Sequence, residues 1–146
     1  MSSFSDILKS SINNVKTNEE FDKDRWAQEK QAQREWAYTA QDEMAERVTQ
    51  NIEEFKNYLD IQSKFDSYSV GNALLVTAQN PKATQLKDVE GWNNEKIYLK
   101  RNAQKIIILE PYQYERDDGT EATGYNPKVL YDISETQSKR KVNTIP

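Results

Sequence analysis

The chain has 146 residues and a net charge of −4, and 36% of its residues are apolar, 30% charged and 10% aromatic. This length fits one domain with its own core, and the aromatic content is too high for a wholly disordered chain. Because cysteine and histidine are both absent, disulfides, thiolate metal sites and mechanisms that need an imidazole base are excluded. We therefore expect a protein that is not an enzyme and that carries no metal or cofactor.

The distribution of charge and of apolar residues limits the partners further. The longest apolar run, residues 106–109, is far too short to span a membrane. The N-terminus lacks the basic and then apolar order of a signal peptide, so we expect a soluble cytoplasmic protein without membrane contacts. Residues 1–66 carry 14 acids and 9 bases, whereas residues 67–146 carry 10 acids and 11 bases. A site for a polyanion is therefore expected in the second half of the chain.

The first 70 residues contain no glycine and no proline, which favours helices throughout this half. We expect a short helix over residues 5–15 and one long amphipathic helix over residues 24–64. Apolar residues recur along the long helix every three or four positions and form one narrow stripe, at Trp36, Ala40, Met44, Val48, Ile52, Phe55 and Leu59. This stripe either packs on the helix's own domain or forms a homodimer seam through Trp36, Met44, Val48 and Ile52. The sequence leaves both open.

Residues 68–81 predict a buried central helix. Residues 73–76 at its centre are apolar on every side of a helix, as expected of a helix that other elements surround. Ser69 supplies a capping hydroxyl at the start of this helix. Pro81 ends it, because the residue before a proline avoids helical backbone angles.

The second half changes from helical to alternating periodicity. A turn and a short helix are expected over residues 83–94, followed by strands over residues 97–100, 105–114 and 129–134. The basic segment 101–104 has the length of a hairpin connection, in which Asn102 tolerates a positive φ. The acidic segment 117–124 is expected to be a solvated turn.

The predicted fold is thus α+β, with N-terminal helices that include one long amphipathic helix, a central buried helix, and a small antiparallel sheet with a basic hairpin. Its expected parts are a helical region 1–64 that packs on the domain, an α+β domain 65–136 and a loose basic tail 137–146.

A cluster of basic and aromatic residues surrounds the predicted hairpin, and only one acid, Glu95, lies within the same fourteen positions. Lysine and arginine attract phosphates, and exposed rings stack on unpaired bases, so the combination suits single-stranded nucleic acid. Alternatively, the tryptophan belongs to the core and the lysines form a solvated hairpin tip. The cluster consists of Trp92, Lys96, Tyr98, Lys100, Arg101 and Lys105.

Three residues around the central helix are further candidates for the same site. Tyr68 precedes the helix cap and offers a ring for base stacking. Asn72 and Gln79, seven positions apart, lie on a similar helix face. They either hydrogen-bond a bound strand or bond the adjacent chain to hold the fold.

Several motifs between about residues 65 and 136 occur in an order that we can compare with a known family. They are Tyr68-Ser69, Asn72, Leu74-Leu75-Val76, Gln79, Pro81, Ala83-Thr84, Trp92, Ile106-Ile107-Ile108-Leu109-Glu110-Pro111 and Tyr131-Asp132-Ile133-Ser134-Glu135-Thr136. This order resembles the N-terminal domain of ArdC-type antirestriction proteins, which also occurs in LtrC-like and TraC-type plasmid primase proteins. Where the family usually has a basic turn with two glycines, roughly Lys-Lys-Gly-Glu-Lys-Gly, this chain has Lys100-Arg101-Asn102-Ala103-Gln104-Lys105, which keeps most of the charge.

The resemblance implies sequence-tolerant binding of single-stranded DNA in a protein of a conjugative plasmid or transposon. It also implies that the chain is the N-terminal part of a larger protein, without the catalytic domain of its relatives. The basic cluster then becomes the preferred site, with phosphates on its lysines and arginine and bases on its rings. The alternative is a protein-interaction or dimerisation module of the DNA-transfer machinery, which acts through the long amphipathic helix.

Overall fold

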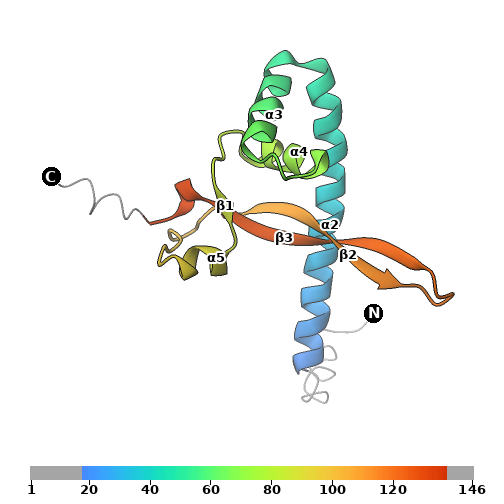
Figure 1. Ribbon diagram of the computed structural model, residues 1–146. Helices are drawn as coiled ribbons and strands as arrows, with labels where there is room; N and C mark the ends of the chain where they lie inside the picture. Colours follow the sequence, from blue (N-terminus) through green and yellow to red (C-terminus); the bar gives the residue numbers. More distant parts are fainter. Residues whose placement is uncertain (1–17, 138–146) are drawn as a thin grey trace, which may run out of the picture. The chain divides into compact units, whose positions relative to one another are not determined.

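The computed structural model describes residues 18–137, with side chains from residue 22 onward, and has a mixed helix and sheet fold (Figure 1). The three strands form an antiparallel sheet in the order β1-β3-β2. This confirms the predicted α+β class, whereas the predicted helix 5–15 and residues 138–146 of the predicted tail lie outside the described residues. The elements are α2 (Asn18–Gln50), α3 (Ile52–Lys64), α4 (Val70–Gln79), β1 (Leu86–Lys87), α5 (Val89–Asn94), β2 (Ile106–Glu115), β3 (Glu121–Asp132) and a 3₁₀ turn (Ile133–Glu135).

The described residues divide into two compact units between residues 33 and 34, within α2. In the first unit, the Lys30 ammonium lies 5.8 Å from the centroid of the Trp26 ring. The second unit, residues 34–137, contains the sheet, the other helices and the two hydrophobic cores.

No helix in the described part of the chain combines the length and the apolar character needed to cross a membrane.

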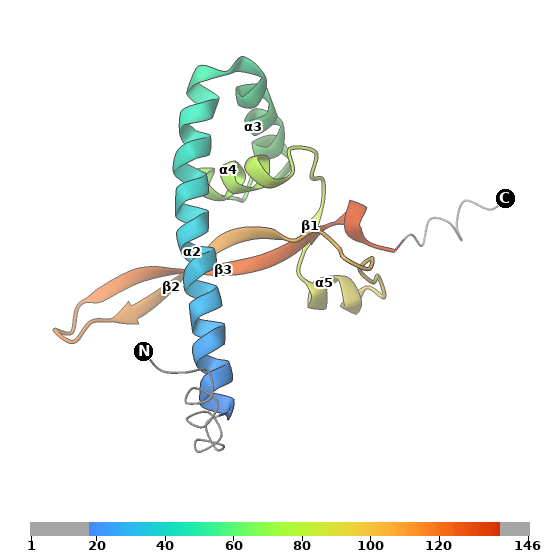
Figure 2. The same ribbon diagram turned by 180° about the vertical axis from the view of Figure 1, so that it is seen from behind.

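The single long helix predicted over residues 24–64 is wrong, because the chain breaks at Asn51. This residue has extended backbone angles, φ −136° and ψ 118°, and its side chain accepts hydrogen bonds from the backbone N–H groups of Glu53 and Glu54. Satisfying these otherwise unpaired N–H groups starts a new helix. Figures 1 and 2 show α3 turning back beside the C-terminal half of α2. The apolar stripe is therefore divided, with Met44 buried on α2 and Ile52 69% exposed on α3.

The central helix α4 forms where the sequence predicts it. The Ser69 hydroxyl accepts from the N–H of Asn72 at the N-terminal end, and Asn80 before Pro81 has extended angles at the other. Residues 73–77 are all buried. Contact on every side is thus the reason for the uniform apolar character of residues 73–76 at the centre of this helix.

The two cores lie on opposite faces of β2, and α4 contributes to both. Val76 belongs to one core with Ile106 and Ile108, and Leu75 belongs to the other with Ile107. Successive side chains of a strand point to opposite faces, so a helix that reaches both cores has to lie along the edge of the strand. The second core also receives Ala37 from α2.

Two side-chain amides of α4 close this edge. The Asn72 amide donates to the carbonyl of Leu109 at 2.8 Å and accepts from its N–H at 2.9 Å. The Gln79 amide pairs in the same way with the carbonyl and the N–H of Ile107, both at 2.8 Å. β2 is an edge strand of the sheet, so the amides replace the backbone of a further strand. In this structure both side chains have the fold-holding role rather than a role in ligand contact.

The predicted pairing of residues 97–100 with the following strand is also wrong. β2 instead pairs with β3 over its whole length, from Ile106 opposite Leu130 to Glu115 opposite Glu121. The connecting turn contains Gly119 at φ 85°, which is accessible to glycine at little cost. Residues 97–105 lack strand structure beyond a single bridge between Leu99 and Thr136. Their long-range backbone hydrogen bonds go to Glu135 and Gln137, and their local ones go to Trp92 and Lys100.

We predict that Asn72→Ala destabilises the fold by about 2–3 kcal/mol, because the N–H and carbonyl of Leu109 lose their partners together. Urea unfolding followed by circular dichroism measures this difference. Asn57→Ala on α3 is the control, because Asn57 is exposed and its side chain has no hydrogen bond to any residue in 18–137. The control should stay within about 0.5 kcal/mol of the wild type. Equal effects of the two substitutions would contradict the closing role of Asn72.

Candidate nucleic-acid interface

The segment that carries most of the predicted DNA-binding residues is an irregular loop, residues 95–105, which we call the basic loop. It leaves α5 through a tight turn in which the Lys96 N–H donates to the carbonyl of Asn93 at 2.9 Å and the Ile97 N–H donates to that of Trp92 at 3.0 Å. In a helix end with these two hydrogen bonds, the residue after the cap has the left-handed conformation and is normally a glycine. Here Lys96 occupies that position, with φ 60°, at a cost of roughly 1–2 kcal/mol.

Trp92 anchors the loop and is not available for stacking. Only 1% of the side chain is exposed, and its ring N–H donates to the carbonyl of Tyr131 at 2.8 Å. The Lys87 ammonium lies 4.9 Å from the ring centroid and forms an ion pair with Glu95. The expectation that Trp92 contacts a base is therefore not met in this structure. The alternative expectation, that Trp92 belongs to the core, is met.

The far side of the basic loop is held by the residues that follow β3. The backbone N–H of Lys100 donates to the carbonyl of Glu135 at 2.9 Å, and that of Gln137 donates to the carbonyl of Tyr98 at 2.6 Å. Asn102 adopts φ 59° within this loop, as the sequence predicted for a residue that tolerates positive φ. The backbone of the loop is thus fixed at several points.

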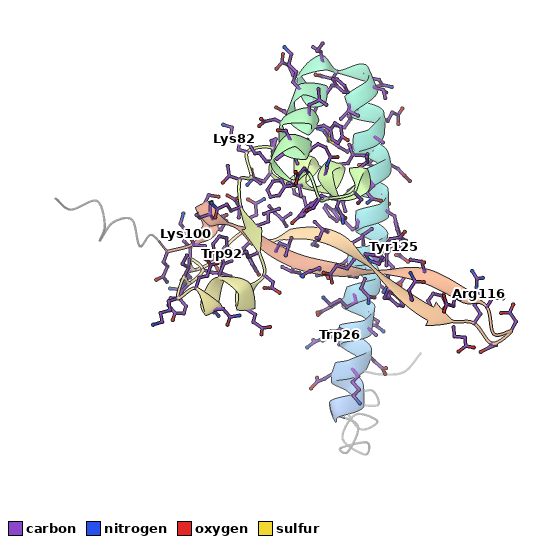
Figure 3. The ribbon with its side chains drawn as sticks, in the orientation of Figure 1. Trp26, Lys82, Trp92, Lys100, Arg116 and Tyr125 are labelled. Carbon is purple, nitrogen blue, oxygen red and sulfur yellow. The ribbon has the colours of Figure 1, made fainter. Side chains whose placement is uncertain are left out.

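The basic side chains of the loop and its tyrosine are exposed to solvent. Tyr98 is 54% exposed, and within residues 18–137 no ion pair involves the loop's lysines or its arginine. Figure 3 shows Lys100 near Trp92 at one end of the sheet and Arg116 at the opposite end, on the β2–β3 turn. The structure therefore groups five of the predicted residues in one exposed loop: Lys96, Tyr98, Lys100, Arg101 and Lys105.

The remaining predicted residues lie elsewhere. Tyr68 is half-buried, with its ring centroid 5.1 Å from that of Phe65, and this burial raises the pKa of its hydroxyl despite the nearby Lys128. Asn72 and Gln79 use their amides on β2. These three residues therefore contribute to the fold next to the sheet and not to the exposed loop.

Asp132 fixes the turn that supports the basic loop. Its carboxylate is buried and accepts from the backbone N–H groups of Thr84, Gln85 and Ser134 at 2.8, 3.2 and 3.0 Å. Burial alone raises the pKa of such a group. A hydrogen bond from the Ser134 side chain, together with the three backbone N–H bonds, outweighs this effect and holds the pKa below the ordinary value of 3.8. The charged carboxylate thus ties the end of β3 to the segment before β1.

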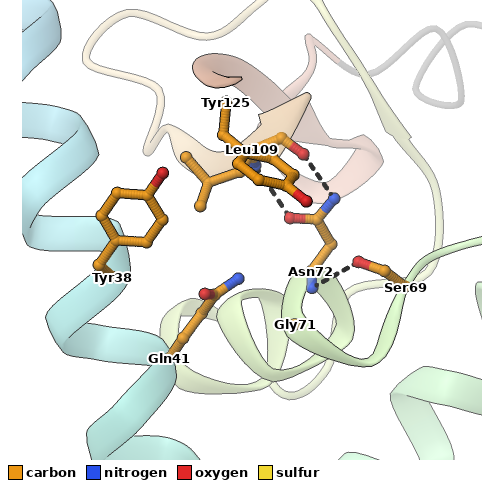
Figure 4. Close-up of a pocket in the computed structure, with 7 residues that line it drawn as sticks. All are labelled: Tyr38, Gln41, Ser69, Gly71, Asn72, Leu109 and Tyr125. Carbon is orange, nitrogen blue, oxygen red and sulfur yellow. Dashed lines mark hydrogen bonds between the residues drawn. The ribbon is translucent and has the colours of Figure 1, made fainter. Parts of the chain in front are cut away.

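A pocket that the sequence did not indicate lies at the N-terminal end of α4 (Figure 4). Its volume is about 310 Å³. Its walls come from four elements, and no local motif connects them, so no sequence pattern marks it. The lining residues are Tyr38, Gln41, Ser69, Gly71, Asn72, Leu109 and Tyr125.

Comparison of the chain with known protein families, with curated proteins and with solved structures finds no match. The resemblance described above therefore remains a prediction from the motifs alone.

We predict that Asp132→Asn lowers the free energy of unfolding at pH 7 by about 2 kcal/mol, since a charged acceptor of three hydrogen bonds is lost. Because the folded-state pKa lies below 3.8, the charge stabilises the fold above that pH, and the stabilisation is lost as the pH falls through the folded pKa. Urea unfolding at several pH values should therefore show the wild type and the variant converging on acidification.

Asp66→Asn is the control for this pH series, because Asp66 is exposed. It should follow the wild type at every pH. A constant difference between the Asp132→Asn variant and the wild type down to acidic pH would contradict the role given to the carboxylate charge.

Proposed function

We propose that this chain binds single-stranded DNA with little sequence preference, and that the basic loop is the binding surface. The observation that carries the proposal is the arrangement of Tyr98, which is 54% exposed, among four exposed cations on a backbone held by α5 and by residues 133–137. A fixed backbone reduces the ordering entropy that a flexible loop would lose on binding. The loop is therefore suited to hold a strand without a large rearrangement.

The chemistry of the loop suits an extended strand. Lys96, Lys100, Arg101 and Lys105 can bind phosphates and release their condensed counterions. Tyr98 offers a ring on which one base can stack, which is worth about 1–3 kcal/mol and is tolerant of sequence because every base has a flat face. None of these contacts reads the edge of a base, so discrimination between sequences by this loop is weak.

The left-handed conformation of Lys96 supports the proposal independently. Glycine would satisfy the same turn at lower cost. Backbone strain of this kind is stored mainly where function needs the side chain. A lysine at φ 60° is therefore consistent with a requirement for its charge at this place.

The motif resemblance supports the same proposal and extends it. It favours a protein of a conjugative plasmid or transposon that acts in the cytoplasm, as in antirestriction or DNA transfer. We propose that the chain is the DNA-binding part of such a protein and that it performs no catalysis itself.

Fluorescence anisotropy with a labelled single-stranded oligonucleotide, at increasing salt, tests the proposal. Four phosphate contacts predict a slope of about −3 for the logarithm of the binding constant against that of the salt concentration. Lys96→Gly should reduce the size of this slope by about 0.7, because one contact is lost. The same variant should gain about 1 kcal/mol of stability, because the strain at position 96 is relieved.

Lys56→Ala on α3 is the matched control, since Lys56 is also exposed and lies outside the basic loop. Its slope and affinity should equal those of the wild type. Binding that is independent of salt, or equal affinity for duplex and single strands, would contradict the proposed function.

The alternative, a protein-interaction module of the transfer machinery, is favoured by one observation. Ile52, Phe55 and Leu59 form an exposed apolar stripe along α3, at 69%, 42% and 48% exposure. Of the residues expected in a homodimer seam, Met44 is only 1% exposed and takes no part in such a surface, Val48 is half-buried and Trp36 is 45% exposed. Sedimentation tests this alternative. It would be favoured if the chain sediments as a stable dimer, if Leu59→Glu abolishes the dimer, and if the chain does not bind DNA.

A further inference from the structure

The pocket at the start of α4 has three polar side chains whose hydrogen-bonding groups are unused within residues 18–137. They are the hydroxyls of Tyr38 and Tyr125 and the amide of Gln41. Figure 4 shows Tyr38 and Gln41 coming from α2 and Tyr125 lying across Leu109. A few convergent polar groups beside aromatic and apolar side chains are typical of a ligand site.

The walls of the pocket are held in place by contacts that do not use these three polar groups. Asn72 is fixed by its paired hydrogen bonds to Leu109. On the other side, the Arg34 guanidinium donates to the backbone carbonyl of Tyr125 at 2.7 Å and to the side-chain oxygen of Asn126 at 3.3 Å. The pocket is therefore formed before any ligand arrives.

Gly71 makes room for the Gln41 side chain. A Cβ atom at position 71 would lie 2.6 Å from the Gln41 amide nitrogen, which is too close. Because that nitrogen is at the end of a flexible side chain, an alanine at position 71 would displace the amide and leave the backbone in place. The absence of a side chain at position 71 thus sets where the amide stands in the pocket.

The lining residues define the chemistry of the occupant. None of them is a lysine, arginine, aspartate or glutamate, so a phosphate or a metal ion would find no opposite charge. The two tyrosine rings and Leu109 offer flat and apolar contacts, and the carboxamide of Gln41 can donate and accept together, as amides do on the edge of a base. A volume of about 310 Å³ lies at the lower end of ligand pockets, which begin at roughly 300 Å³.

We propose that this pocket binds one unpaired nucleobase of the strand whose phosphates lie on the basic loop. This inference rests on the proposed function and adds a base-contacting subsite to it. Leu109 in the pocket wall follows Lys105 by four residues, about 13 Å at a strand rise of 3.3 Å per residue. One extended strand can therefore contact both places.

Photocrosslinking tests the inference. A short oligothymidine that carries 5-iododeoxyuridine is bound to the whole chain, irradiated and digested, and the crosslinked residues are identified by mass spectrometry. We expect adducts on Tyr38 or Tyr125 in addition to Tyr98. Tyr125→Leu should remove its adduct and weaken binding, whereas Tyr114→Leu, which alters an exposed tyrosine near the β2–β3 turn, should change neither.

Gly71→Ala is expected to change the pocket without destabilising the fold. The variant should unfold at the same or higher urea concentration, because alanine favours a helix more than glycine does. Its affinity for the oligonucleotide should nevertheless fall about fivefold, the effect of one displaced hydrogen bond.

The outcomes distinguish this inference from the proposed function. Binding with adducts confined to Tyr98, and with undiminished affinity in Gly71→Ala and Tyr125→Leu, would overturn the pocket inference alone. Absence of oligonucleotide binding by the wild-type chain would overturn both.

Discussion

The pairing of two side-chain amides with the open edge of β2 is the constraint on which the rest of the structure depends. An unpaired strand edge buried beside a helix would lose its hydrogen bonds to water, which is costly for each N–H and carbonyl. Asn72 and Gln79 replace those bonds at Leu109 and Ile107. A slip of β2 by one residue would lose both pairs and also exchange the two cores, so the amides fix the register as well as the edge.

Both candidate binding features depend on this constraint. The basic loop joins α5 to the first residue of β2, so the register of β2 sets where the loop ends. The pocket uses Leu109, which Asn72 holds, as one of its walls. At the same end of the sheet as the basic loop, the carboxylate of Asp132 shapes the turn that receives the loop backbone. The fold therefore supplies two rigid supports for contacts whose side chains remain exposed.

Local chemistry explains what could be predicted from the sequence. Ser69 and Pro81 bound α4 through contacts within a few residues, so its position follows from the sequence directly. The break at Asn51 also has a local signal, an asparagine followed three residues later by Glu54, but the apolar spacing continues across it and favours one helix. The burial of Trp92 and the pairing of residues 97–105 depend on residues 131–137, more than thirty positions away. The same holds for the pocket, which joins α2 to β3, and such non-local contacts have no sequence pattern of their own.

Amide hydrogen exchange at Ile107 and Leu109 tests the edge closure most directly. Because both N–H groups donate to the side-chain amides of Asn72 and Gln79, we predict that they exchange as slowly as the N–H of Ile108, which faces β3. Gln113 is the internal reference, because it lies on the same edge of β2 beyond the reach of α4 and is exposed. Exchange at Ile107 and Leu109 as fast as at Gln113 would contradict the closure of this edge by α4.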